Sequence, residues 1–289
     1  MTATEKFIYR NLAPLRRIVQ ITALLFIIAV PFLNRLGYKQ IIGTYYSLSI
    51  GNLEVVDPAI MMQTVLLTKQ FYIPLLLAAV VPILIAFFLG KVFCGWICPF
   101  NFLAEFTDRV RKKLRPRTVR VRNTNPFPYT YWLIFMSVFL ILLVSGVPIV
   151  THISMPGLLS AQLADLIFSG TLGLEILLVI LILLLEIFTV PRFWCKYICP
   201  VGATLALFRS PHALKIKFTT SKCTCSAGNF LECHSACPLH LDPRNPGIYP
   251  YCFNCGACVD ACRRNGQALL FSFRDDEKAT PTAQEPQTT

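Results

Sequence analysis

The stretch CFNCGACVDAC, residues 252–262, contains four cysteines, which are separated by two gaps of two residues and then one gap of three. Such short gaps let three thiolates of one loop converge, and Gly256 suits a loop that must turn tightly. This spacing is typical of a motif whose first three cysteines hold one [4Fe–4S] cluster while the fourth serves a second cluster. The stretch therefore predicts a small cysteine-ligated α+β domain of the two-cluster ferredoxin type at the C-terminal end.

A second group of cysteines lies upstream and ends in Cys237-Pro238, the usual close of a first cluster motif. Its early part is unusual, because a Cys-x-Cys step and a seven-residue gap replace two gaps of two residues. The exchange of fourth ligands between two such motifs predicts two sets. They are Cys237, Cys252, Cys255 and Cys258 for cluster one, and Cys223, Cys225, Cys233 and Cys262 for cluster two.

Zinc or disulfides are the alternatives for these cysteines. Zinc accepts four thiolates and tolerates Cys-x2-Cys pairs, but the order of eight cysteines with a third at x2 and a fourth at x3 favours iron–sulfur clusters. Disulfides are disfavoured if the domain faces the cytoplasm, which keeps thiols reduced.

The composition indicates a membrane protein. The 289 residues are 55% hydrophobic and 15% charged, whereas about 25% of residues are charged in a typical soluble domain. The apolar residues gather in runs that are long enough, or nearly so, to cross a bilayer. We expect an all-α polytopic fold with four transmembrane helices, at Ile18–Leu33, Phe71–Phe93, Tyr131–Val150 and Leu172–Val190.

The distribution of Lys and Arg predicts the orientation. Basic residues are concentrated near the N-terminus, between the second and third runs and after the fourth, while residues 151–171 contain none. The positive-inside rule then places both termini in the cytoplasm and residues 34–70 and 151–171 on the other side of a bacterial inner membrane. The first run has no small-residue cleavage site and is expected to remain as a span. The net charge of +12 fits contact with anionic lipid better than nucleic-acid binding.

An internal repeat links the second and fourth runs. FCGWICPF, residues 93–100, and WCKYICPV, residues 194–201, share an aromatic-Cys-x3-Cys-Pro pattern. Residues i and i+4 of a helix share a face, so each pair of cysteines should point together. If the halves pack about a pseudo-twofold axis, the thiolates could hold a further cluster or form a redox-active thiol set; filling of a helix end is the plain alternative. The four cysteines are Cys94, Cys98, Cys195 and Cys199.

The remaining candidates are carboxylates. Glu175 and Glu186 lie in the fourth run. Ionisable residues within a membrane span are functional candidates, here for proton handling or a quinone site. Both residues lie near the ends of the run, however, where a carboxylate can reach the membrane interface at little cost in free energy. We expect His152 and Asp165 to be ordinary solvated residues. No catalytic residue, nucleotide fingerprint or flavin motif is predicted. The expected units are a membrane domain, 1–211, a cytoplasmic ferredoxin-type domain, 212–274, and a disordered tail, 275–289.

Together these motifs resemble the NapH family of membrane ferredoxin-type proteins, and also MauN and the membrane half of NosR. The resemblance extends from Arg16 to about Phe273 and includes Val56-Asp57-Pro58 on the far side. It implies a quinol dehydrogenase component that passes electrons from the quinol pool towards a periplasmic reductase through partner subunits. A maturation factor that supplies electrons or reduced thiols to a periplasmic enzyme is the rival hypothesis.

Overall fold

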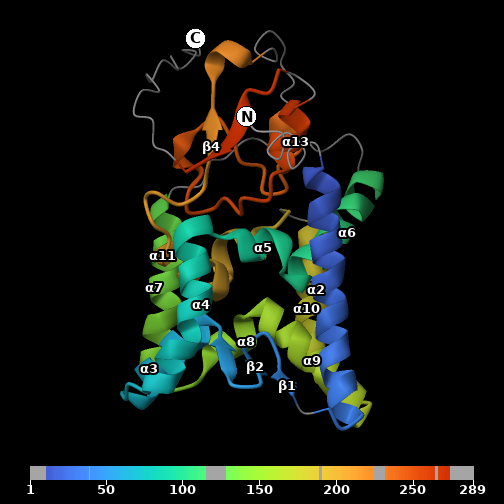
Figure 1. Cartoon of the computed structure of the whole chain (residues 1–289), viewed down its shortest axis with the longest axis vertical. Helices are drawn as coiled ribbons and strands as arrows, with labels where there is room; N and C mark the ends of the chain where they lie inside the picture. Colours follow the sequence, from blue (N-terminus) through green and yellow to red (C-terminus); the bar gives the residue numbers. More distant parts are fainter. Residues whose placement is uncertain are drawn as a thin grey trace.

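The computed structural model describes residues 11–38, 40–114, 128–188, 191–223, 232–263 and 266–273. Figure 1 shows two columns of helices joined across the middle, with the cysteine-rich part above them. The helices are α2 (Leu12–Arg35), α3 (Pro58–Thr68), α4 (Ile73–Leu89), α5 (Val92–Trp96), α6 (Pro99–Leu114), α7 (Pro128–Ser145), α8 (Ile149–Ile153), α9 (Met155–Ser169), α10 (Glu175–Phe188), the π-helix η1 (Trp194–Ile198), α11 (Pro200–Leu207), α12 (Glu232–Ser235) and α13 (Ala257–Arg263).

The two columns are helical bundles with different members. Helices α2, α6, α9 and α10 pack against one another in one column, and α3, α4, α7 and α11 pack in the other. The short helix α5 crosses between them (Figure 1). The two cysteine motifs of the repeat follow α4 and α10, so both enter the space between the columns from the end that carries the cysteine-rich domain.

Among the described residues, α2 is the helix whose length and composition suffice to cross a membrane. Its 24 residues rise about 36 Å, against about 30 Å of hydrocarbon. Shorter apolar helices lie at Pro58–Thr68, Ile73–Leu89 and Tyr129–Ser145. The structure therefore supports a mostly helical fold, with helices after the first that are shorter than the sequence runs predicted.

The predicted bounds of the later runs are wrong at their ends, for local reasons. Helix α4 stops at Leu89 because Gly90 takes a φ of 68°, so Phe93 belongs to α5 instead. Helix α7 stops at Ser145, where Gly146 has a φ of 67° and Pro148 follows. The fourth run is helical from Glu175 to Phe188.

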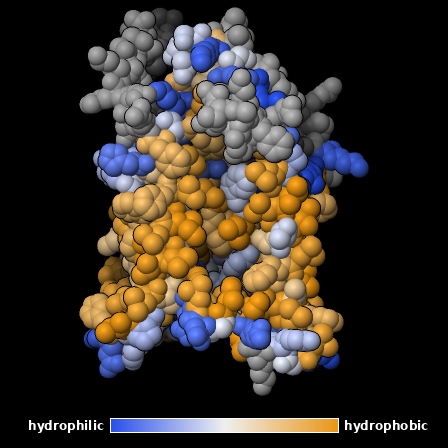
Figure 2. All heavy atoms as spheres, in the orientation of Figure 1, coloured by the Kyte–Doolittle hydropathy of each residue, from blue (hydrophilic) through white to orange (hydrophobic). Residues whose placement is uncertain are grey.

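The apolar side chains of these helices face outwards. Leu140 on α7 is 63% exposed and Leu181 on α10 is 57% exposed. Figure 2 shows a broad hydrophobic band over both columns, with hydrophilic residues gathered above it and along its lower rim. Exposed apolar surface of this extent marks a membrane or protein contact rather than a water-facing surface.

The segment 34–70, expected to be a far-side loop, contains regular structure. Strands β1 (Ile41–Gly43), β2 (Ser47–Ile50) and β3 (Leu53–Val56) form an antiparallel sheet in the order β1-β2-β3, and α3 follows. Tyr46 fixes this sheet to the helices, since its hydroxyl donates to the carbonyl of Thr151 at 2.5 Å and its ring fills the space beside Gly157. The segment 151–171 likewise contains α9, not an open loop.

The cysteine-rich unit combines short helices with a two-stranded sheet. Strand β4 (Lys215–Phe218) pairs antiparallel with β5 (Leu269–Ser272), and α12 and α13 pack together. This agrees with the small α+β unit expected from the sequence. The division at residues 211 and 274 stays a prediction, and the tail 275–289 lies outside the described residues.

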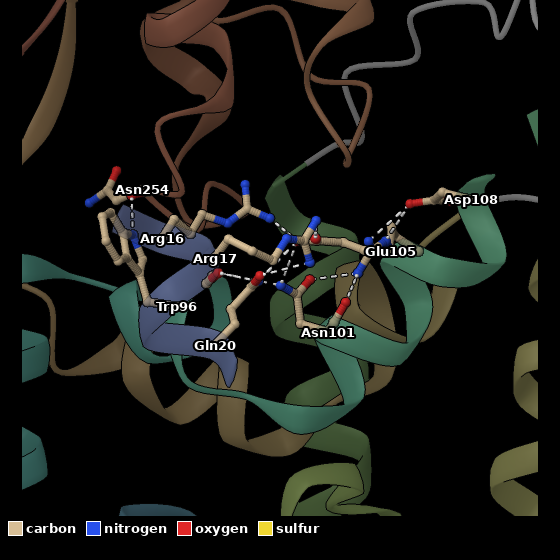
Figure 3. A network of polar contacts seen from close by, with 10 residues as sticks. Arg16, Arg17, Gln20, Trp96, Asn101, Glu105, Asp108 and Asn254 are labelled. Carbon is tan, nitrogen blue, oxygen red and sulfur yellow. Dashed lines mark hydrogen bonds and ion pairs between the residues drawn. The ribbon is translucent and has the colours of Figure 1, made fainter. Parts of the chain in front are cut away.

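A buried arginine joins the repeat halves. Arg192, with no exposed side-chain surface, donates from Nε to Oδ2 of Asp108 at 3.0 Å and from Nη1 to the carbonyl and Oδ1 of Asn101 at 3.0 and 2.5 Å. Figure 3 shows its partners Asn101 and Asp108 close to Glu105. Arg192 precedes the second cysteine motif while Asn101 and Asp108 follow the first, so this network fixes the two motifs relative to each other.

We predict that Arg192→Met destabilises the protein by about 3 kcal/mol, because removal of one partner leaves Asp108 and the Asn101 carbonyl without their buried donor. The melting temperature in detergent measures this effect. Arg35→Met is the control, because Arg35 makes an exposed bond to the carbonyl of Ile167. Equal melting temperatures for the two variants would contradict the structural role of Arg192.

Candidate iron–sulfur sites

The four cysteines predicted for cluster one line a single cavity. Cys237, Cys252, Cys255 and Cys258 surround it together with apolar side chains that include Leu239, Leu241 and Ile248. Their sulfurs lie near enough to interact electrostatically, Cys258 with each of the other three. The structure thus brings together the whole predicted set around an apolar space, the environment in which clusters are held.

The loop that carries three of these cysteines depends on two left-handed residues. Asn254 has a φ of 50° and Gly256 a φ of 76°. A Cβ on Gly256 would lie 2.4 Å from Cδ2 of Leu12, so the loop can approach α2 only with glycine there. The Asn254 amide donates at 2.9 Å to the carbonyls of Leu89 and Leu214, which holds the loop against the end of α4.

Burial keeps these thiols protonated when no metal is bound. Desolvation raises the pKa of the Cys237 thiol to about 11 and that of Cys252 to about 12. Thiolates are the iron ligands, so binding of iron has to displace the proton from each sulfur. Iron binding at this site therefore releases protons and strengthens as the pH rises.

The predicted second set is described in part. Cys223, Cys233 and Cys262 pack in one buried cluster with Leu12 and Val259, while Cys225 lies outside the described residues. Arg244 stands within electrostatic range of Cys223 and Cys233 and forms an ion pair with Asp242. The sequence analysis did not single out this arginine.

The four cysteines of the repeat also converge. Cys94 lies within electrostatic range of Cys98 and Cys199, and Cys195 within range of Cys98 and Cys199. Cys94 and Cys98 are buried, each 8% exposed. We call Cys94, Cys98, Cys195 and Cys199 the cysteine quartet. The predicted meeting of the two halves at these residues is consistent with their positions.

The cysteines of each motif lie near each other, as expected, but the turn between them is wider than a regular α-helical turn. The amide of Cys98 donates to the carbonyl of Phe93 at 3.0 Å, and the amide of Cys199 to that of Trp194 at 3.0 Å. Both bonds reach back five residues, which is the wider π turn. Pro99 and Pro200 then begin the next helices, α6 and α11, because proline suits a first turn that needs no N–H donor.

Lys91 lies between the quartet and the cluster-one set. It is 1% exposed, and its Nζ donates to the Tyr131 hydroxyl at 2.8 Å and to the Pro250 carbonyl at 3.1 Å. Its strongest electrostatic partners among the described residues are thiol groups, those of Cys94, Cys199, Cys195 and Cys252. The sequence analysis counted Lys91 only among the basic residues that predict the orientation. Its place next to a cysteine motif was the signal that could have identified it as a site residue.

The two cysteine sites are neighbours in the fold. A Cβ on Gly95, which follows Cys94 in α5, would lie 3.0 Å from Cβ of Cys255. The indole Nε1 of Trp96 donates to the carbonyl of Asn254 at 3.1 Å (Figure 3). Main chain of α5 therefore contacts the cluster-one loop directly.

The carboxylates have different surroundings. Glu186 is 3% exposed; its Oε1 accepts from the Trp194 amide at 3.2 Å, and Cys195 lies within its electrostatic range. Glu175 instead contacts Nδ1 of His152 at 3.0 Å near the far side, so His152 is exposed but paired. Asp165 is exposed, as expected.

Asp57 is a further carboxylate near the quartet, which the sequence analysis named only as part of the Val56-Asp57-Pro58 stretch. It caps α3 and lies within electrostatic range of Cys94 and Cys199.

None of the eleven described cysteines forms a disulfide. Within the described ranges, no three side chains of the types His, Cys, Asp or Glu are arranged as ligands of a single metal ion. A [4Fe–4S] cluster differs from a single ion, because its four thiolates bind different iron atoms and stand farther apart.

Comparison with known proteins agrees with these sites. A family model described as a 4Fe-4S binding domain matches residues 71–117 and 171–219, so the same model covers both halves of the repeat. The chain is 31% identical over 201 residues to the uncharacterized protein MJ0749 of Methanocaldococcus jannaschii, which covers 68% of this chain and 70% of that protein. No solved structure matches the chain.

Two relatives have descriptive names. The ferredoxin-type protein NapH of Haemophilus influenzae is 26% identical over 278 residues, covering 90% of this chain and 89% of that protein. The methylamine utilization ferredoxin-type protein MauN of Paracoccus denitrificans is 27% identical over 253 residues, covering 86% and 74%. The repeated cysteine motifs and the 4Fe-4S binding domain define an iron–sulfur protein of the electron-transport class. The chain belongs to the family of ferredoxin-type proteins that includes NapH and MauN.

We predict that Gly95→Ala lowers the stability by about 2 kcal/mol, because the added methyl group overlaps backbone of the cluster-one loop and forces it away from α5. Thermal unfolding of the anaerobically purified protein measures this loss. Gly247→Ala is the matched control, since its Cβ would meet the Asn245 side chain, 3.1 Å away, on an exposed turn. A G95A variant as stable as G247A would show that the close contact is not needed.

Proposed function

We propose that this protein spans a bacterial inner membrane with four helices and passes electrons between the quinol pool and a periplasmic redox system. The observation that carries the proposal is the adjacency of the cysteine quartet and the cluster-one set, joined by Lys91 and by the contact of Gly95 with Cys255. Two buried thiol sites in direct contact, within a family that binds 4Fe-4S clusters, favour a conducting path over isolated structural sites.

The proposed ligands follow from the sequence spacing, and the surroundings of the described ones fit them. Cluster one is held by Cys237, Cys252, Cys255 and Cys258; cluster two by Cys223, Cys225, Cys233 and Cys262; and a third cluster by Cys94, Cys98, Cys195 and Cys199. Bound clusters supply one-electron redox steps. Support for the third is that the two matches to the 4Fe-4S binding model each contain one half of the quartet.

Lys91 supports a negatively charged quartet. A buried ammonium is costly unless an opposite charge compensates it, and its strongest partners here are cysteines. Neutral thiols would not compensate that charge, whereas iron-bound thiolates would. The rings of Tyr131 and Phe253 stand 4.8 and 5.3 Å from Nζ and add cation–π attraction. With iron-bound thiolates at the quartet, Lys91 would carry a compensating positive charge between the two sites.

The membrane assignment rests on the apolar band and on the helices beneath it. Helix α2 is long enough to cross, and α4, α7 and α10 present exposed apolar faces at the same level (Figures 1 and 2). Shorter helices can span where the bilayer thins or flanking residues extend to the interface. The cysteine-rich domain then lies in the cytoplasm, on the side of the basic residues.

Quinol oxidation releases two protons with two electrons, so a proton acceptor is needed near the electron entry site. Glu186 is the better placed of the two predicted carboxylates, because it is buried beside Cys195 while Glu175 pairs with His152 at the far side. We place quinol binding among the helices near Glu186. The periplasmic acceptor is a partner chain, reached through partner redox subunits.

The experiment is anaerobic mixing of the oxidised protein in lipid nanodiscs with a reduced quinol analogue, followed by the absorbance of the iron–sulfur chromophore. We expect bleaching within a single turnover, and a Cys195→Ser variant that is reduced at least tenfold more slowly. Dithionite reduction of the same samples controls for cluster content. A protein that dithionite bleaches but quinol does not would contradict the quinol role and favour the maturation hypothesis.

A further inference from the structure

A basic cavity lies where the columns meet the cysteine-rich domain. Its volume is about 200 Å³, and a second cavity of about 230 Å³ shares the walls formed by Arg16, Arg17 and Glu105. Residues of α2 and α6 form its floor, and the segment 235–238 with His240 covers it. We call the first of these the arginine cavity. Its charged lining residues are Arg16, Arg17, Glu105, Asp108, Arg109 and Arg111.

Positive charge exceeds negative charge in this lining. Among the described residues it contains four arginines against two carboxylates. Glu105 already pairs with Arg16 and, at 3.0 Å, with Arg17 (Figure 3). Asp108 is held by Arg192 from outside the cavity at 2.9 Å. The lining therefore carries more cationic than anionic groups.

The close arrangement of the arginines favours binding of an anion. Arg109 and Arg16 both lie near enough to repel the charge of Arg17. Nε of Arg16 is buried and has no hydrogen-bond partner in the described part of the chain. Clustered like charges are unfavourable without a counter-charge, and guanidinium groups bind phosphate through paired N–H donors.

The dimensions select the kind of anion. Sites for whole drug-sized or cofactor molecules usually measure about 300–1,000 Å³, so this cavity fits a phosphate group with few further atoms. Phe106, 63% exposed on α6, stands about one helical turn before the cationic residue Arg109. An apolar chain attached to the phosphate could lie along this exposed face.

We propose that the arginine cavity binds a phosphate-type anion, supplied either by an anionic phospholipid headgroup or by a soluble phosphate. The anion neutralises the arginines of α2 and α6 and at the same time contacts the segment 235–238, so it fastens the cysteine-rich domain to the helical body. This inference uses no property of the clusters and is independent of the proposed function.

Thermal unfolding of the full chain tests the proposal. Protein in nanodiscs of phosphatidylcholine is compared with protein in nanodiscs containing phosphatidylglycerol, and detergent-solubilised protein is titrated with inorganic phosphate. A rise of the melting temperature with phosphatidylglycerol alone assigns the lipid headgroup, and a rise with inorganic phosphate assigns a soluble source. No rise in either arm overturns the proposal.

Two variants locate the effect. Arg109→Gln removes an exposed cation of the cavity lining. We expect the apparent affinity for phosphatidylglycerol or inorganic phosphate to fall about fivefold, as for the loss of one cation near an anionic lipid. Lys113→Gln removes the same charge from an exposed position on α6 outside the cavity and should leave the affinity unchanged. Equal losses in both variants would show only diffuse attraction to α6 and would overturn a built site.

Discussion

The loop of residues 252–256 rests directly on α5, and this contact determines how the two parts of the molecule are arranged. It depends on the absence of a side chain at Gly95, on the Trp96 indole bond to Asn254, and on the Asn254 amide bonds to Leu89 and Leu214. Because the loop carries cluster-one cysteines and α5 carries the quartet residue Cys94, the same contact places two thiol sites side by side. The contact that packs the two parts together is thus also the path that the proposed electron transfer would use.

Two buried cations hold neighbouring parts of the molecule together. Lys91 bonds to Tyr131 in the helical body and to the Pro250 carbonyl in the cysteine-rich unit. Arg192 joins the two halves of the repeat through Asn101 and Asp108. Each buried charge is costly by itself; Arg192 is compensated by the Asp108 carboxylate, and Lys91 would be compensated by the thiolates of the proposed quartet cluster. Charge and position are therefore coupled at the centre of the molecule.

The sequence predicted the chemistry better than the path of the chain. The cysteine spacings identified all four cysteines that line the cluster-one cavity, since local gaps of two and three residues determine which sulfurs can converge. The bounds of the apolar helices were less predictable, because hydrophobicity continues past Gly90 and Gly146 while the backbone turns there. The sheet β1-β2-β3 was missed because its strands are three or four residues long and half exposed.

Lys91, Asp57 and Arg244 show a different limit of sequence reasoning. Each is an unremarkable charged residue in its local context, and only the tertiary fold brings it near cysteines that are distant in sequence. The internal repeat did give the quartet, since two copies of one motif imply one meeting point. The wider turn within each copy could not be inferred, because an aromatic-Cys-x3-Cys-Pro pattern fits both an α turn and a π turn.

The most direct test of the central claim is the iron and acid-labile sulfide content per chain of anaerobically purified protein, measured with EPR after dithionite reduction. Three cubane clusters predict about twelve irons and about twelve sulfides. A variant with Cys94 and Cys199 both changed to serine should retain about eight of each. About eight irons in the unmodified protein would contradict a cluster at the quartet, and zinc in place of iron would contradict the electron-transfer account as a whole.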